Sequence, residues 1–132
     1  MSDQSEPNKQ SRAIIVDDSE LMRRVVIAAL TALDCEVVGE ADDGDAGIAL
    51  YKDASPDLVL LDIRMPIMDG LTTLKKLQEI DPGAYVVMMT AVEDEESIED
   101  AMIGGAKDYL RKSMAMNEMI NRLERHVNRT KT

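Results

Sequence analysis

The chain has 132 residues, which suits a single domain with its own hydrophobic core. Its 15 Lys and Arg residues against 26 Asp and Glu residues give a net charge of −11, so a nucleic-acid backbone is not expected as a direct partner. One cysteine, Cys35, excludes an internal disulfide, and no signal segment or apolar run of membrane-spanning length is present. With a single histidine, His126, the chain also lacks the ligands of a zinc site, and we expect a cytoplasmic protein.

The chain begins with a polar stretch that contains one proline, and we expect residues 1–11 to form a flexible tail. A β-branched run, residues 12–16, then predicts a strand that ends on Asp17 and Asp18. Ser19 is a suitable N-cap for the helix that follows. That helix is expected to bury one broad apolar face, made of Leu21, Met22, Val25, Val26, Ala29, Leu30 and Leu33.

A second strand and helix come next. Residues 36–41 predict the strand, and Asp42-Asp43-Gly44 predicts the turn after it. We expect the helix over residues 45–53, with three residues turned toward the core: Ile48, Ala49 and Leu50.

An aliphatic run, residues 58–61, separates the acids Asp57 and Asp62. Aliphatic residues without alternation predict a strand that is buried on both faces, as parallel strands between helix layers are. Asp62 closes this run, and a carboxylate is stable there only where the strand emerges at the carboxyl edge of the sheet, the edge at which α/β proteins carry out their chemistry. Asp62 is therefore a candidate functional residue, with a turn-capping role as the alternative.

The second half of the chain continues the alternation. Pro66 ends the strand, and Asp69-Gly70 forms a turn before a helix over residues 71–80, which Asp81-Pro82-Gly83 terminates. Three further elements are a strand over residues 84–89 with Thr90 at its end, a helix from the acidic residues 93–96 to Gly104-Gly105, and an edge strand over residues 107–112. The acidic start either complements the helix dipole or is ordinary solvated surface. The last helix has an apolar stripe of Met116, Met119, Ile120, Leu123 and Val127.

Five predicted strands thus alternate with five predicted helices. This alternation predicts an α/β fold, in which right-handed crossovers cover both faces of a five-stranded parallel sheet. Because the chain shows no internal repeat and no second alternating unit, we expect one folded domain.

The predicted strand ends bring together residues that are far apart in the sequence: Asp17 and Asp18, Asp62, Thr90 and Lys112. Carboxylates at short range repel one another by roughly 4 kcal/mol per close pair at an effective dielectric near 20, so they need a counter-charge. A hard divalent cation suits an all-oxygen site, and Mg²⁺ prefers a few carboxylates with water and a phosphoryl oxygen. A carboxylate nucleophile, Mg²⁺, an ammonium and a hydroxyl are what in-line phosphoryl transfer requires.

Four motifs make the chain resemble the receiver domains of two-component response regulators, in particular the single-domain chemotaxis type. They are Ile14-Ile15-Val16-Asp17-Asp18-Ser19-Glu20-Leu21-Met22-Arg23-Arg24, Leu60-Leu61-Asp62-Ile63-Arg64-Met65-Pro66-Ile67-Met68-Asp69-Gly70, Met89-Thr90-Ala91 and Gly105-Ala106-Lys107-Asp108-Tyr109-Leu110-Arg111-Lys112. The resemblance spans residues 12–128, with every element in order. It implies a receiver domain over residues 12–129, built as a flavodoxin-like, doubly wound sheet with strand order 2-1-3-4-5.

The resemblance also implies the roles of the acidic residues. Asp62 would be the phosphoacceptor and would receive its phosphoryl group from a phosphohistidine on a sensor histidine kinase or phosphotransfer protein. Asp17, Asp18 and Asp62 would hold Mg²⁺ together with the main-chain carbonyl of Arg64.

The remaining implied roles concern catalysis and switching. Thr90 would bond a phosphoryl oxygen, Lys112 would pair with the phosphoryl charge, and the Arg64 side chain would lie over the site toward residues 93–95. Tyr109 would turn inward when Thr90 moves, changing the face of the fourth helix, fifth strand and fifth helix for a downstream protein target; otherwise it packs flat as an edge-strand aromatic. The chain is then a signalling domain and not an enzyme, since it catalyses only its own phosphoryl transfer and dephosphorylation.

Three other hypotheses apply to the same residues. A phosphatase of the haloacid dehalogenase type needs a second Asp two residues after the nucleophile, where this chain has Arg64. A P-loop nucleotide hydrolase needs Gly-x-x-x-x-Gly-Lys-Ser/Thr, which is absent from the sequence. A phosphorylation-independent interaction module of the same fold stays open as the alternative.

One position departs from the family pattern. The family lysine is followed almost always by proline in a cis peptide bond, whereas Lys112 is followed by Ser113. A cis bond before a residue other than proline costs roughly 2.5–4 kcal/mol, against about 0.5–1 kcal/mol before proline. We therefore predict a trans Lys112–Ser113 bond, and a changed path of the Lys112 side chain to the site.

Overall fold

The computed structural model describes residues 9–91 and 95–131, and it contains one parallel sheet in the order β2-β1-β3-β4-β5. The strands are β1 (Arg12–Val16), β2 (Glu36–Ala41), β3 (Leu58–Asp62), β4 (Val86–Thr90) and β5 (Asp108–Arg111). The helices are α1 (Glu20–Ala32), α2 (Gly44–Ala54), α3 (Gly70–Ile80), α4 (Glu95–Ile103) and α5 (Met116–Thr130). The predicted fold class and strand order are confirmed.

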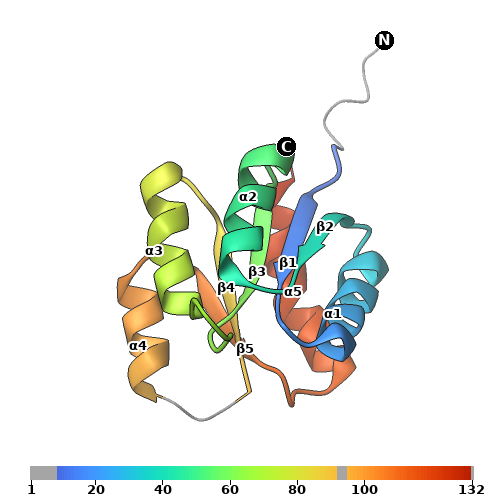
Figure 1. Cartoon of the computed structure of the whole chain (residues 1–132). Coiled ribbons are helices and arrows are strands. Elements are labelled where there is room, and N and C mark those ends of the chain that lie inside the picture. Colours follow the sequence, from blue (N-terminus) through green and yellow to red (C-terminus); the bar gives the residue numbers. More distant parts are fainter. Residues whose placement is uncertain (1–8, 92–94, 132) are drawn as a thin grey trace.

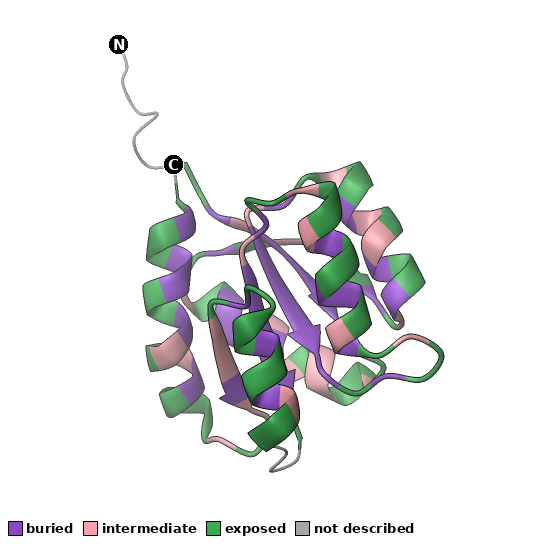
Figure 2. Ribbon diagram, turned by 90° about the vertical axis from the view of Figure 1, so that its left-hand side faces the viewer, coloured by how far each residue is buried: buried purple, intermediate pink, exposed green. Residues whose placement is uncertain are grey.

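Helices cover both faces of the sheet (Figure 1). Residues of α2, α3 and α4 pack in one core cluster with one side of the strands, and residues of α1 and α5 pack in a second cluster with the other side. Every residue of β3 and β4 is buried, and Figure 2 shows buried strands between helices whose outer faces are exposed. The unbroken aliphatic runs of the sequence are thus explained, because these strands have no solvent face.

Side chains of the connecting loops start three of the helices. Ser19 accepts a hydrogen bond from the Met22 amide, which confirms Ser19 as the N-cap of α1. Asp43 and Asp69 cap α2 and α3 in the same way. Each cap satisfies an otherwise unpaired amide, so local sequence fixes where these helices begin.

Several predicted details are wrong. Leu21 is 72% exposed and Met116 is 40% exposed, although both were placed on buried helix faces. Each lies in the first turn of its helix, and the buried residues of these helices begin later, at Val26 in α1 and at Met119 in α5. In α2, Ala49 is exposed, while Gly47 and Tyr51 are buried.

The start and the end of the packed domain are in contact, and this contact includes a residue of the predicted tail. Residues 1–8 lie outside the described residues, but Ser11 is fully buried and its hydroxyl lies 2.6 Å from the Thr130 hydroxyl. The packed body therefore includes one residue on each side of the predicted range 12–129. The predicted helix start at residues 93 and 94 also lies outside the described residues, and α4 is described from Glu95.

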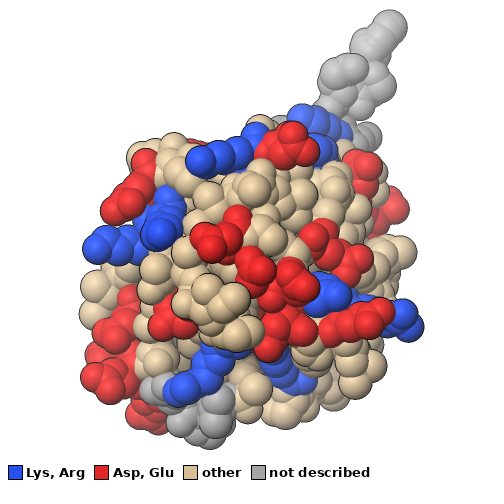
Figure 3. All heavy atoms as spheres, in the orientation of Figure 1, with Lys and Arg blue, Asp and Glu red and all other residues tan. Residues whose placement is uncertain are grey.

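Two further properties concern the helices and the surface charge. Across residues 9–91 and 95–131, no helix has the length and apolar character to cross a bilayer. Acidic side chains are spread over the face seen in Figure 3, with fewer basic ones between them, in keeping with the net charge of −11.

Gly70 offers a test of how tightly the loop after β3 is packed. A Cβ atom at Gly70 would overlap the carbonyl oxygen of Asp62 and lie 2.7 Å from the Cα atom of Ile63. We predict that Gly70→Ala lowers the free energy of unfolding by at least about 2 kcal/mol, because rigid backbone must move. Urea unfolding followed by circular dichroism measures it.

Gly83→Ala is the matched control. Its Cβ atom would have Asp81 Oδ1, at 3.4 Å, as its nearest neighbour, which is an ordinary contact. Its stability should stay within about 0.5 kcal/mol of wild type. Equal stabilities of the two variants would contradict the prediction.

Candidate functional site

Three carboxylates meet at the carboxyl edge of the sheet. Asp17 and Asp18 follow β1 and Asp62 ends β3, and these strands are direct neighbours in the sheet. One carboxylate oxygen from each residue lies within 4.8 Å of the others. Asp17 and Asp62 are buried, whereas Asp18 is exposed, so the cluster has one side open to solvent. The predicted meeting of the acidic strand ends is confirmed.

A lysine from the other end of the sheet reaches the same place. The Lys112 ammonium lies 2.8 Å from Asp17 Oδ2 and 3.1 Å from Asp62 Oδ2, although β4 separates β5 from β3. The Lys112 amide donates to the carbonyl oxygen of Thr90 at 2.8 Å, which ties the end of β5 to the end of β4. Thr90 is itself buried. All the predicted strand-end residues therefore come together at one edge.

The peptide bond after Lys112 has the predicted form. No cis peptide bond occurs in the described part of the chain, so the Lys112–Ser113 bond is trans. A proline at position 113 is thus not needed for the ammonium to reach Asp17 and Asp62.

Burial and charge together set the ionisation of the cluster. Burial, followed by repulsion from Asp17, raises the pKa of Asp62 to about 7, and the Lys112 ammonium offsets this only in part. Burial alone would lower the pKa of Lys112, but its contacts with Asp17 and Asp62 outweigh that effect and raise it. Without a cation, Asp62 therefore holds a proton over much of the range in which other carboxylates are ionised.

The cluster fits a hard divalent cation. Asp17 Oδ1 accepts a hydrogen bond from the Ser19 amide at 2.8 Å, but the buried Asp17 Oδ2 accepts no aligned hydrogen bond from the described residues. Asp62 Oδ1 accepts the Arg64 amide at 3.2 Å. The Oδ2 atoms of both buried carboxylates face the Lys112 ammonium, itself a cation, and an all-oxygen set of this kind suits Mg²⁺.

Arg64 and Tyr109 are the two other residues predicted to act at the site. Arg64 is exposed, and residues 93 and 94, toward which its side chain was predicted to extend, lie outside the described residues. Tyr109 is half-buried against the core cluster beneath α2, α3 and α4, with the Arg111 guanidinium carbon 5.9 Å from its ring centre. Its predicted movement stays a prediction.

The contacts of two side chains, Arg23 and His126, were not predicted from the sequence. Arg23 on α1 donates to the carbonyl oxygen of Asp17. His126, considered only as part of an amphipathic helix, is buried between Tyr85 and Asp108. Its Nδ1 lies 2.8 Å from the Tyr85 hydroxyl oxygen, and its Nε2 lies 2.8 Å from Asp108 Oδ2. The His126 contacts join elements far apart in the chain, and the Arg23 contact spans six residues, which is outside the usual capping and helix-pair spacings.

The fold and the strand-end residues define a flavodoxin-like α/β domain with an acidic site at the carboxyl edge of its sheet. The sequence profile of the response regulator receiver domain matches residues 13–124. The chain belongs to this family, and so to two-component signal transduction.

Known relatives agree with the family. The chemotaxis protein CheY of Bacillus subtilis (strain 168) is 38% identical over 117 residues, which cover 89% of this chain and 98% of that protein. CheY of Treponema pallidum (strain Nichols) is 40% identical over 114 residues, 85% of this chain and 79% of that protein. A solved structure, the CheX–CheY–BeF3–Mg complex from Borrelia burgdorferi, has a TM-score of 0.84 at 31% identity and covers 89% of this chain and 90% of that chain. Phosphoaccepting response-regulator function is consistent with these relatives and with the acidic cluster.

The raised pKa of Asp62 predicts a pH dependence of stability in chelator, without metal. Its folded pKa of about 7 lies above the ordinary 3.8, so the folded state binds an extra proton between these values. The associated stability is fully present below about pH 3.8 and is lost as the pH rises toward 7. As the pH rises over this range, the free energy of unfolding of wild type should therefore fall relative to that of Asp62→Asn.

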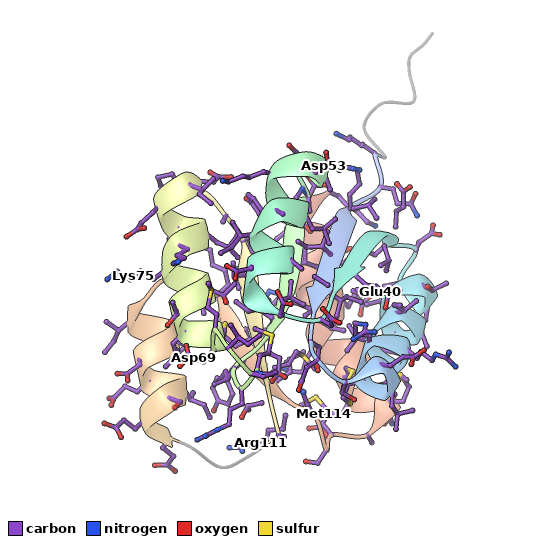
Figure 4. The ribbon with its side chains drawn as sticks, viewed as in Figure 1. Glu40, Asp53, Asp69, Lys75, Arg111 and Met114 are labelled. Atoms are coloured by element: carbon purple, nitrogen blue, oxygen red, sulfur yellow. The ribbon has the colours of Figure 1, made fainter. Side chains whose placement is uncertain are left out.

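Asp53→Asn controls for the loss of any acid. Asp53 is exposed and lies on α2 at the opposite end of the molecule from Arg111 and Met114, which lie near the carboxyl edge (Figure 4). Its pH profile should run parallel to that of wild type. A parallel profile for Asp62→Asn as well would contradict the prediction.

Proposed function

We propose that Asp62 accepts a phosphoryl group from a phosphohistidine of a sensor histidine kinase or phosphotransfer protein. The observation that carries this proposal is the position of the Asp62 carboxylate. It ends the buried central strand β3, beside two further carboxylates and 3.1 Å from the Lys112 ammonium. A nucleophile held this way needs no large movement to reach a phosphoryl group at the sheet edge.

The proposed step balances without a further reactant. An ionised Asp62 oxygen attacks phosphorus, the bond from phosphorus to the histidine nitrogen breaks, and the imidazole leaves with the electron pair. Because the pKa of Asp62 is raised to about 7, a counter-charge that favours its ionised form also favours attack. Lys112 supplies one such charge from the protein itself.

Asp17, Asp18 and Asp62 are the residues that would hold Mg²⁺, with the main-chain carbonyl of Arg64. When bound, Mg²⁺ neutralises charge on the phosphoryl oxygens during transfer. Support comes from the three carboxylates, which place oxygens within 4.8 Å of one another, and from the Mg-containing complex of the Borrelia burgdorferi relative. Thr90 would donate its hydroxyl to a phosphoryl oxygen, and Lys112 would hold a second one.

We propose that phosphorylation changes the face made of α4, β5 and α5, where a downstream protein binds. The phosphoryl group acts as a ligand that binds one of two existing states better. Thr90 and Tyr109 are the proposed switch residues. Thr90 ends β4, and Tyr109, on the neighbouring strand β5, lies opposite Met88 of β4. A cytoplasmic location and the absence of direct nucleic-acid binding stay predictions from the sequence.

The alternative is a receiver-like interaction module that works without phosphorylation. Such a module has no need to keep acids, hydroxyl and ammonium together at one edge. Here Asp17, Asp18, Asp62, Thr90 and Lys112 are all present, and contacts join Lys112 to Asp17 and Asp62. The complete set favours phosphotransfer.

Labelling with a small phosphodonor tests the proposed function. Wild type incubated with acetyl phosphate and Mg²⁺ should gain one phosphoryl group per chain, detected by intact-protein mass spectrometry, and should lose it in acid or base. Asp62→Asn should take up none, because an amide is not a nucleophile toward phosphorus, while its circular dichroism spectrum stays that of wild type. Asp53→Asn should label normally. Labelling of Asp62→Asn at the wild-type rate would refute the assignment.

Arg64 gives a prediction about loss of the phosphoryl group. Its side chain is exposed and follows the acceptor by two residues in the chain. We predict that Arg64→Ala changes the half-life of the phosphorylated protein at least about threefold, shorter if the side chain shields the group and longer if it orients the water. Lys75→Ala, an exposed change on α3, should leave the half-life alone, and an equal half-life for Arg64→Ala would oppose the idea.

A further inference from the structure

Asp17 is held from three sides. Its amide donates to the Ala41 carbonyl on β2 at 3.0 Å, and its Oδ1 accepts from the Ser19 amide at 2.8 Å. Its carbonyl oxygen accepts from Arg23 Nη1 at 2.7 Å. The remaining polar atom, Oδ2, accepts no aligned hydrogen bond from the described residues and faces the Lys112 ammonium at 2.8 Å. The surroundings of Asp17 therefore present a single oxygen to the site.

Arg23 is the charged member of this arrangement. While Nη1 binds the Asp17 carbonyl, Nε binds Glu40 Oε1 on β2 at 2.9 Å, and only 16% of the Arg23 side chain is exposed. A guanidinium has a planar, fixed set of donors, so two contacts from one group fix both distance and angle. Arg23 thus joins the ends of β1 and β2 from a position on α1.

We propose that Arg23 is a positioning residue for the cation site, holding the Asp17 main chain so that Oδ2 points to the bound ion. The inference rests on the proposed function, because that function places Mg²⁺ at Asp17, Asp18 and Asp62. Arg23 touches neither the ion nor the phosphoryl group. It acts through the carbonyl of a ligand residue, as outer partners of metal ligands commonly do.

The charge of Arg23 and its positioning role have opposite consequences. A positive charge near the site repels Mg²⁺, so by charge alone its removal tightens Mg²⁺ binding. Loss of positioning frees the Asp17 main chain, and Mg²⁺ binding then weakens. The sign of the change separates the two effects.

Titration of the full chain with Mg²⁺ by isothermal calorimetry tests the proposal. Arg23→Ala should raise the Mg²⁺ dissociation constant about tenfold, within the range seen for outer partners of metal ligands. Arg23→Lys should raise it nearly as much, because one ammonium keeps the charge but not the two-armed geometry. Asp18→Asn, which removes a proposed ligand, serves as the reference for a weakened site.

Arg24 supplies the matched control on the same helix. Its side chain is 74% exposed and pairs with Glu20 one turn away on α1. Arg24→Ala removes the same charge and should leave the dissociation constant within twofold of wild type. Thermal unfolding in chelator shows whether each variant is folded. If Arg23→Ala is unfolded, the Mg²⁺ dissociation constant of Arg23→Lys tests the proposal instead.

The outcomes are distinct. An unchanged or smaller dissociation constant for Arg23→Ala overturns the positioning role, and so does wild-type binding by Arg23→Lys. Wild type that binds Mg²⁺ and accepts a phosphoryl group, with Arg23→Ala unchanged, refutes this inference alone. Wild type that binds no Mg²⁺ refutes it together with the proposed metal site.

Discussion

Repulsion between carboxylates at the carboxyl edge of the sheet is the constraint on which this structure depends. Two unit charges about 4 Å apart cost roughly 4 kcal/mol at an effective dielectric near 20. Asp17 and Asp62 are both buried, and with Asp18 they place oxygens within 4.8 Å of one another. The rest of the domain must therefore hold together groups that would separate in an open chain.

The hydrophobic core supplies the force that opposes this repulsion. β1 and β3 lie side by side, and their residues Ile14 to Val16 and Leu58 to Leu61 are almost completely buried, so the strand ends cannot move apart without exposing apolar surface. Lys112 offsets part of the cost as an internal counter-charge. Such strain at a site is expected where a ligand, here a cation or a phosphoryl group, completes the balance.

The errors in the sequence-based prediction have a common origin. Leu21 and Met116 fit the apolar spacing of their helices, yet both are exposed, because the buried faces of α1 and α5 begin only at Val26 and at Met119. Ala49 was expected to turn inward, but the neighbours of α2 contact Gly47 and Tyr51 instead. The spacing of apolar residues defines one face of a helix. How much of that face is buried depends on the elements that pack against it.

The sequence by itself determined the elements, the caps and the strand-end residues. Ser19 as an N-cap and Asp62 after an aliphatic strand follow from interactions within a few residues, and burial on both faces leaves the parallel sheet as the solution. Only the tertiary structure decided that Lys112 contacts Asp17 and Asp62, that burial beside Asp17 raises the pKa of Asp62 to about 7, and that Arg23 holds the Asp17 carbonyl. The first two properties depend on distances between groups far apart in the chain, which do not exist until the sheet has formed, and the third depends on how α1 packs beside the residues that follow β1.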